Sequence, residues 1–321
     1  MKVSRIHEQG PPEVLRYEDS PDPSPGEGEA LVKVEAIGVN FTDVNSRSGA
    51  SPVPALPAVL GREAAGVVTA VGSGVSEFQV GDAVGWCGVT GSYAEQVAVP
   101  VSALVKLPQG IDTKTAAAAL LQGMTAHYLA FGICSLESGD SVLVHAGAGG
   151  TGLLLIQMAK HAGATVYTTV STGEKAALAT EAGADVVINY TTEDFAERVM
   201  KGTGGKGAKA VFDAVGKTTI EGSLASVSRR GYLALYGQAS GPVPPVSRAS
   251  IRSSSYLTCP TLGDYTATRE ELEWRSSEVL GWVASHQLRL RIGGTFGLSE
   301  AHEAHRQLQG RESTGKLVLV P

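Results

Sequence analysis

One glycine-rich segment, residues 146–152, has the residue types and spacing to bind a charged ligand. Gly147, Gly149 and Gly152 stand at the positions of the G-x-G-x-x-G pattern, after an apolar run that predicts a strand and before one that predicts a helix. Glycine permits the tight turn, and the N–H groups at the start of the helix can then approach a pyrophosphate, which the helix dipole favours. The segment predicts a dinucleotide site, and a glycine-rich turn without a ligand is the alternative.

The residues after the second strand of such a unit indicate which dinucleotide is bound. An Asp or Glu there would accept hydrogen bonds from the ribose 2′-hydroxyl of NAD. Here residues 165–170 are followed by Ser171, Thr172 and Lys175, whose hydroxyl groups and ammonium suit a 2′-phosphate instead. The sequence therefore predicts NADPH in preference to NADH. Glu174 is expected to point into solvent, and an ordinary surface position on a helix is the alternative for Lys175.

Strand and helix patterns alternate regularly around this segment, from residue 141 to residue 236. The predicted strands are 141–145, 165–170, 186–188, 208–214 and 231–236, and the predicted helices are 151–162, 174–182, 193–200 and 220–227. Repeated strand–helix units predict a doubly wound parallel sheet. Strands as apolar as these suit a sheet that is covered on both faces.

The first 108 residues have a different pattern, typical of short strands separated by Gly and Pro. This pattern indicates an all-β domain, followed by one long helix. After residue 255 only a helix and a short tail remain, too little to bury a core of their own, so we expect the tail to return to the first domain. The predicted strands are 30–39, 64–71, 79–85, 93–99 and 316–320, and the predicted helices are 112–131 and 268–286. The first predicted domain consists of residues 1–123 together with 262–321, and the second consists of residues 124–261.

Length and composition agree with two globular domains. The chain has 321 residues, of which 43% are hydrophobic and 18% charged, and its formal net charge is −6. An acidic chain without basic stripes has no general attraction to nucleic acid or anionic lipid, so a small molecule is the expected partner. Cys87, Cys134 and Cys259 show no disulfide or metal spacing, and we expect neither a signal peptide nor a membrane span. These features favour the cytoplasm.

Seven short motifs together make the chain resemble the zeta-crystallin-like quinone oxidoreductases, a zinc-free group in the medium-chain dehydrogenase/reductase superfamily. The resemblance covers essentially the whole chain. It implies an α/β protein with a GroES-like, β-rich catalytic domain built from both chain ends, a doubly wound Rossmann domain that binds NADPH, an active-site cleft between them, and a homodimer formed through the edge strand near residues 256–259. The motifs are residues 10–15, 38–43, 61–66, 146–152, 188–190, 212–216 and 313–316.

The resemblance also implies roles for individual residues around the cofactor. Asn40, Thr125 and Tyr128 would face its nicotinamide half. The other implied contacts are Gly149, Gly150 and Thr151 at the pyrophosphate; Ser171, Thr172, Lys175 and Tyr190 at the 2′-phosphate; and Val215, Tyr236, Gly237, Gln238 and Lys316 from later segments.

The alcohol dehydrogenases of the same superfamily bind zinc, and the corresponding residues here do not form such a site. Asn40, Arg62 and Gln122 stand where those enzymes place Cys, His and Cys, and their cysteine-rich structural lobe is missing. His302 and His305 are three residues apart instead of four, and both are expected on the solvated face of a polar helix. We therefore expect a metal-free enzyme whose natural substrates are conjugated acceptors.

The expected reaction is hydride transfer from nicotinamide C4 to a quinone, or to the β-carbon of an α,β-unsaturated ketone or aldehyde. Asn40 and Thr42 are the candidates for binding the oxygen that gains charge, with Arg62 as an electrostatic helper. Structural roles are the alternatives: Asn40 as a turn cap, Thr42 bonded to backbone, and Arg62 in a buried ion pair with Glu63.

The substrate pocket is where the sequence departs from the resemblance. Asn45 and Ser51 stand where related reductases often place tyrosines, so a wider and more polar pocket is expected. Trp86 and Tyr93 could line it, but aromatic residues in a β domain are more often core. Two other functions stay open: an enoyl-thioester or alkenal double-bond reductase, and a non-enzymatic structural or RNA-binding role, which the acidic charge disfavours.

Overall fold

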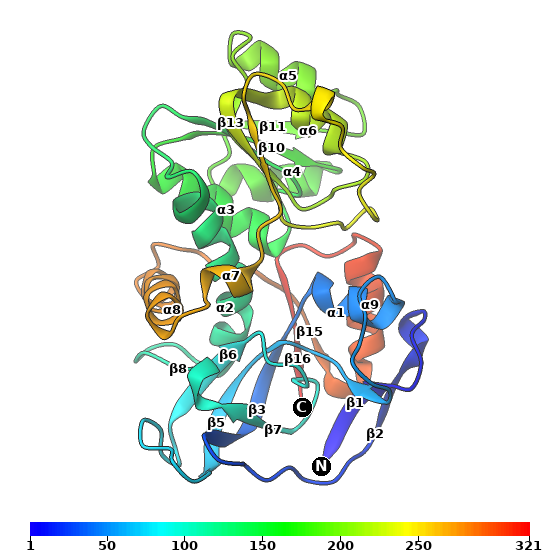
Figure 1. Ribbon diagram of the computed structural model, residues 1–321, viewed down its shortest axis with the longest axis vertical. Helices are drawn as coiled ribbons and strands as arrows, with labels where there is room; N and C mark the ends of the chain where they lie inside the picture. The colour runs from blue at the N-terminus through cyan, green and yellow to red at the C-terminus, as the bar shows by residue number, and fades with distance from the viewer. The chain divides into compact units, whose positions relative to one another are not determined.

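The chain divides into two units in the computed structural model, which describes residues 1–321 (Figure 1). Met1–Leu121 and Thr266–Pro321 form the first unit, and Gln122–Tyr265 form the second. The first is rich in β-strands and the second has a parallel sheet, so the predicted fold class is confirmed. The domain boundaries expected from the sequence stay a prediction.

The second unit is built on a six-stranded sheet in which every neighbouring pair is parallel. The strand order is β11-β10-β9-β12-β13-β14, the Rossmann order, and it reverses between β9 and β12. The loops that follow β9 and β12 therefore leave the same edge of the sheet side by side. The strands are β9 (Ser141–Val144), β10 (Thr165–Val170), β11 (Val186–Asn189), β12 (Ala208–Asp213), β13 (Val227–Leu235) and β14 (Tyr256–Thr258).

Helices cover both faces of this sheet. Helix α3 packs with α4 on β9 and β10, and α5 packs with α6 next to β11 and β12. Because strand–helix–strand crossovers are right-handed and the strand order reverses at β9, the two helix pairs lie on opposite faces. The helices are α3 (Gly150–His161), α4 (Gly173–Glu181), α5 (Phe195–Gly202), α6 (Ile220–Ser226) and α7 (Leu262–Tyr265).

The first unit contains a seven-stranded sheet and a three-stranded sheet. The larger has the order β15-β16-β3-β5-β6-β8, with β7 also paired to β3, and the smaller has the order β2-β1-β4. Strand β16 from the chain's end pairs antiparallel with β3, which places the tail in this unit. The strands are β1 (Lys2–Ile6), β2 (Leu15–Asp19), β3 (Glu29–Val39), β4 (Ala58–Val59), β5 (Glu63–Val71), β6 (Ala83–Cys87), β7 (Gln96–Pro100), β8 (Leu104–Lys106), β15 (Ile292–Gly297) and β16 (Lys316–Val320).

The prediction of an all-β first domain is wrong, because a helix directly follows β3. Helix α1 (Phe41–Ser48) begins after Asn40, whose backbone N–H donates to the Asp43 carboxylate over 2.9 Å, and ends at Gly49 with φ of +88°. An acid at the third helical position and a left-handed glycine after the last turn are ordinary helix signals, but a segment this short shows little apolar periodicity. The other helices of this unit are α8 (Arg269–Ala284) and α9 (Ala301–Gln309).

Helix α2 (Thr113–His127) continues into a π-helical turn at Tyr128–Ile133. Length and composition alone would allow this stretch to cross a membrane. However, 72% of its most apolar window is buried inside the protein, as in the core helix of a globular protein. Ala116–Leu120 are completely buried, which explains why the segment is so apolar.

Candidate functional site

The glycine-rich loop joins β9 to α3 in the second unit, as the sequence predicts. A Cβ atom on Gly147 would lie 2.0 Å from the Thr168 hydroxyl oxygen, and one on Gly152 would lie 2.3 Å from the Ala146 carbonyl oxygen, so both positions require glycine. Gly149 is different, because a Cβ there would meet only the Ala146 carbonyl oxygen, at 3.2 Å. Gly147 and Gly152 therefore let strand and helix pack closely, while Gly149 stands at the helix start.

Helix α3 begins at Gly150, and the first amides of a helix have no partner within it. Gly149, Gly150 and Thr151 are all partly exposed. The Gly149 N–H donates to the Ala146 carbonyl over 2.9 Å, so the N–H groups of Gly150 and Thr151 are the ones that can donate to a ligand. Their positive dipole end suits an anion such as pyrophosphate. The geometry fits the predicted dinucleotide at this loop.

The polar residues expected at the 2′-phosphate lie at the end of β10 and the start of α4. Thr172 precedes α4, and its hydroxyl accepts the Lys175 backbone N–H over 3.2 Å. Ser171 and Lys175 are half-buried, and Glu174 is exposed as expected. Tyr190 donates its backbone N–H to Val170 over 3.1 Å and leaves 43% of its surface exposed. No acidic residue occupies the end of β10.

A buried carboxylate, Asp213, organises the loop after β12. Its Oδ1 accepts the backbone N–H groups of Val215 and Gly216 over 2.8 and 2.9 Å, and both of its oxygens contact the Thr219 hydroxyl. The backbone carbonyl of Asp213 accepts the Tyr236 N–H over 3.0 Å. This role of Asp213 was not predicted from the sequence, although an acid inside an apolar strand signals that it must be paired.

The remaining predicted cofactor residues of the second unit differ in exposure. Thr125 and Tyr128 are buried, and the Tyr128 ring stacks on Tyr265 with centroids 4.4 Å apart. Burial raises the pKa of Tyr128 and of Tyr236, so both phenols are protonated at neutral pH. Gly237, Gln238 and Val215 are at least partly exposed.

A buried charged cluster lies where β3, β5 and β16 of the first unit meet. Lys316 Nζ lies 2.5 Å from Glu63 Oε2 and 2.7 Å from Asn40 Oδ1, and Asn40 Nδ2 donates to Glu63 Oε2 over 2.8 Å. The Leu121 N–H donates to the other Glu63 oxygen over 2.7 Å. A Cβ on Gly38 would lie 2.3 Å from Glu63 Oε2, so that glycine makes room for the cluster.

This cluster changes how two predictions are understood. The alternative of an ion pair between Arg62 and Glu63 is wrong, because Glu63 points inward to the fully buried Lys316. The amide of Asn40 and the ammonium of Lys316 are already hydrogen-bonded to protein groups. A direct contact of Asn40 or Lys316 with a cofactor stays a prediction, while their structural role is plain in the geometry.

A second buried network connects α1 to α9. The Tyr93 hydroxyl lies 2.8 Å from His305 Nε2 and 3.3 Å from Asp43 Oδ2. Burial raises the pKa of Asp43 to about 7, and burial together with the nearby charge of Arg47 lowers the pKa of His305 to about 3. The expected solvated position of His305 is wrong, because its neutral ring packs edge-on against Tyr93 in the core.

The other first-unit candidates are more accessible. Thr42 is exposed, and its hydroxyl makes no hydrogen bond to the protein, so the backbone-bonded alternative is wrong. Asn45, Ser51 and Arg62 are half-buried. Trp86 and Tyr93 are completely or almost completely buried, which confirms that they belong to the core.

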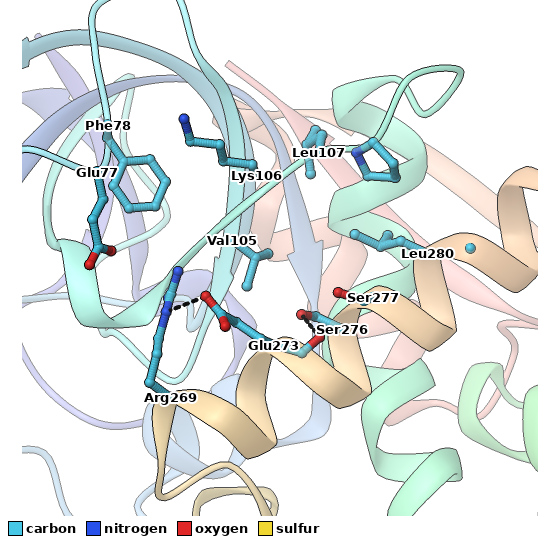
Figure 2. Close-up of a pocket in the computed structure, with 12 residues that line it drawn as sticks. Glu77, Phe78, Val105, Lys106, Leu107, Arg269, Glu273, Ser276, Ser277 and Leu280 are labelled. Atoms are coloured by element: carbon cyan, nitrogen blue, oxygen red, sulfur yellow. Dashed lines mark hydrogen bonds and ion pairs between the residues drawn. The ribbon is translucent and has the colours of Figure 1, made fainter.

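A groove of about 670 Å³ opens elsewhere on the first unit, between β8 and α8 (Figure 2). Arg269 and Glu273 on its α8 side form an ion pair of 2.8 Å. No predicted site residue lines this groove, so it is separate from the candidate site. The structure also brings together no group of three or more His, Cys, Asp or Glu side chains that could hold a metal ion.

Two sequence models of protein families match the chain. The alcohol dehydrogenase GroES-like domain matches residues 26–109, in the first unit, and a family described as zinc-binding dehydrogenase matches residues 150–274. The two models correspond to the two halves of a medium-chain dehydrogenase/reductase.

Known relatives extend the match to nearly the full chain. A quinone oxidoreductase of Pseudomonas aeruginosa is 45% identical over 315 residues, 97% of each chain, and a 2-haloacrylate reductase of Burkholderia is 40% identical over 326 residues, 98% of each. The Escherichia coli quinone oxidoreductase solved with NADPH is 38% identical, with a TM-score of 0.98 over the full length of both chains. The chain belongs to the quinone oxidoreductase family of the medium-chain dehydrogenase/reductase superfamily, and the expectation of an oxidoreductase enzyme is confirmed.

Proposed function

We propose that this protein reduces quinones or related conjugated carbonyl compounds with NADPH, by hydride transfer and without a metal ion. The observation that carries the proposal is the second unit's loop, where the amides at the start of α3 stand free for a pyrophosphate. Ser171, Thr172 and Lys175 follow β10 in place of an acid, which supports NADPH over NADH. A mycobacterial relative, 47% identical with a TM-score of 0.96 over both full chains, was also solved with NADPH.

The chain's own residues would bind and orient the reactants. NADPH supplies the hydride, from its nicotinamide C4. The exposed Thr42 hydroxyl is available to hydrogen-bond the acceptor oxygen that gains charge. Asn40 would donate to the same oxygen only by giving up the hydrogen bond from its Nδ2 to Glu63 or to the Gly38 carbonyl, so we assign its side chain chiefly to the buried cluster with Glu63 and Lys316. Thr125, Tyr128, Tyr190, Val215, Tyr236, Gly237 and Gln238 remain proposed cofactor contacts, and Asn45, Ser51 and Arg62 remain proposed substrate contacts.

The absence of zinc is part of the proposal. Asn40, Arg62 and Gln122 offer an amide, a guanidinium and a second amide, none of which is a thiolate or imidazole. Without a Lewis acid, a simple ketone lacks its electrophilic activation, whereas a quinone or an enone accepts hydride into a conjugated system.

A second candidate reaction is reduction of an activated double bond in an alkenal or an enoyl thioester. The 2-haloacrylate reductase, 40% identical to this chain, is a relative whose name gives a conjugated acid as substrate. Both candidates share NADPH and hydride transfer to a conjugated system, so they differ only in the acceptor.

We also propose a cytoplasmic homodimer. Strand β14 ends the six-stranded sheet, so one of its edges has no partner strand, and Tyr256 on it is 53% exposed. An unpaired edge strand can pair with a second copy. Sedimentation of the purified protein as a monomer would contradict the dimer.

Turnover with a panel of acceptors tests the proposal. Purified protein, treated with a chelator, is supplied with NADPH or NADH and with benzoquinone, phenanthrenequinone, an alkenal or an enoyl thioester, and loss of the reduced cofactor is followed by absorbance. We expect chelator-resistant turnover with NADPH preferred. Preference for NADH would contradict the role of Lys175, loss of activity with chelator would contradict the metal-free reaction, and turnover of the thioester alone would select the second candidate.

A further inference from the structure

A buried histidine, His145, directly follows β9, and no step of the proposed reaction uses it. Its side chain is completely buried. The ring nitrogen Nδ1 lies 3.0 Å from the Thr169 hydroxyl, and Nε2 lies 3.0 Å from the Ser223 hydroxyl. The Phe195 ring packs edge-on against the imidazole, with centroids 4.7 Å apart. The ring is therefore held on three sides.

The partners of Ser223 determine which imidazole nitrogen carries the proton. Ser223 Oγ lies 2.7 Å from Asp213 Oδ2, and this carboxylate is surrounded by donors, so the serine hydroxyl donates to it. With its only hydrogen committed, Ser223 must accept from His145 Nε2. The Nδ1 atom is then an acceptor, and the Thr169 hydroxyl donates to it. Burial lowers the pKa of His145, in agreement with a neutral ring.

The hydrogen bonds form one chain with a single direction. The Ala146 N–H approaches Thr169 Oγ1 at 3.4 Å, Thr169 donates to His145, His145 donates to Ser223, and Ser223 donates to Asp213. Aligned donors in a medium of low dielectric polarise one another, so such a chain is stronger than its separate bonds.

The two ends of this hydrogen-bond chain lie in the two loops that follow β9 and β12. Ala146 opens the glycine-rich loop with a φ of +55°, a conformation that a residue with a side chain rarely adopts. The Gly147 N–H holds the same loop to the Thr169 carbonyl over 3.1 Å. At the other end, Asp213 anchors the amides of Val215 and Gly216 in the loop after β12. The histidine thus joins two loops that leave neighbouring strands.

The set His145, Ser223 and Asp213 has the residue types of a hydrolytic triad but not its arrangement. In a triad the carboxylate binds the histidine, which then takes the serine proton. Here the carboxylate takes the serine hydrogen bond itself, and all three side chains are completely buried. The set cannot reach a substrate, so its role is positional.

We propose that His145, protonated on Nε2, is a positioning residue that fixes the glycine-rich loop in its dinucleotide-binding conformation by joining Thr169 to Ser223 and Asp213. The inference rests on the proposed function, because it assumes that this loop binds NADPH. It predicts that removing the hydroxyl of Thr169 or of Ser223 weakens NADPH binding, although both side chains are buried.

Four variants separate this role from ordinary packing. Thr169→Val and Ser223→Ala each remove one hydroxyl from the hydrogen-bond chain. Each should raise the dissociation constant and KM for NADPH about tenfold and change kcat at saturating NADPH little. Thr169→Ser keeps the hydroxyl and should bind as the wild type does. Ser226→Ala is the matched control, because Ser226 is a buried serine of α6 whose hydroxyl donates to the Gly222 carbonyl instead.

Nitrogen NMR of His145 adds a measurement that does not depend on activity or on the folding of a variant. The wild type should show a neutral ring protonated on Nε2. A proton on Nδ1, a charged ring, or NADPH binding by Ser223→Ala and Thr169→Val as tight as in Ser226→Ala would overturn the positioning role alone. A wild type that binds no NADPH would overturn the proposed function together with it, so the two failures are distinguishable.

Discussion

Replacing the buried Asp43 with asparagine should change how the stability of this protein depends on pH. The Asp43 side chain is 1% exposed, and its Oδ2 accepts from the Asn40 N–H and the Tyr93 hydroxyl. Its Oδ1 has no hydrogen-bond partner. An ionised carboxylate is poorly stabilised in such surroundings, and burial raises the pKa of Asp43 from 3.8 to about 7.

The sign and size of the effect follow from this shift. Between pH 3.8 and about 7 the folded protein keeps a proton that the unfolded chain has released, so the stability contributed by Asp43 falls as the pH rises. The penalty that accumulates between pH 5 and pH 8 is about 3 kcal/mol. Asparagine does not titrate, so Asp43→Asn should gain about 3 kcal/mol relative to the wild type over this range. Because the pKa of His305 is lowered, its contribution to stability rises with pH, opposite to that of Asp43. This contribution is the same in the wild type and in Asp43→Asn, so it cancels in the difference.

Urea unfolding at pH 5 and at pH 8, followed by tryptophan fluorescence, measures this difference. Asp82→Asn is the control, because the hydrogen bond from Lys106 lowers the pKa of Asp82 near the surface. The stability of Asp82→Asn relative to the wild type should change little between the two pH values, and in the opposite direction. If Asp43→Asn and the wild type lost stability in parallel between the two pH values, the carboxylate would not be the buried, poorly solvated group described here.

Three further predictions concern single side chains. Lys316→Met leaves a buried carboxylate without its cation and should lower the free energy of unfolding by about 3 to 5 kcal/mol, whereas Lys106→Met at a surface pair should cost about 0 to 1 kcal/mol, as measured by urea unfolding. Gly152→Ala places a Cβ 2.3 Å from a backbone carbonyl and should abolish NADPH binding measured by cofactor fluorescence, while Gly281→Ala, which meets no atom within 4 Å, should bind normally. Lys175→Ala should raise KM for NADPH about tenfold and leave KM for NADH unchanged. Equal effects on the two KM values would contradict a contact between Lys175 and the 2′-phosphate.

The parallel-sheet half of the chain could be predicted closely from its sequence. Its strands are short apolar runs between helical segments, and β10 lies at residues 165–170 as expected. The glycine-rich loop was recognisable because Gly147 and Gly152 are required by contacts with nearby parts of the chain, Thr168 on β10 and Ala146 in the loop itself. Local patterns were sufficient here because local geometry creates the site.

Buried polar side chains were not predictable in the same way. Lys316 and Glu63 are 253 residues apart in the sequence, and Tyr93 and His305 are 212 apart, so no local pattern joins them. Polar residue types at positions 63 and 305 look like surface residues until the partner is known. His145 ends the predicted strand 141–145, and no local pattern there indicates its partners; its hydrogen bonds to two hydroxyls allow a polar ring to be buried at a strand end.

The most direct test of the central claim is to follow the hydride itself. The protein is incubated, with chelator present, with an enone and with NADPH that carries deuterium on the transferred position of nicotinamide C4, and the product is analysed by mass spectrometry and NMR. We predict one deuterium on the β-carbon of the saturated product and slower turnover than with unlabelled NADPH. A product without deuterium, or no consumption of NADPH with enone or quinone, would contradict hydride transfer from NADPH to a conjugated acceptor.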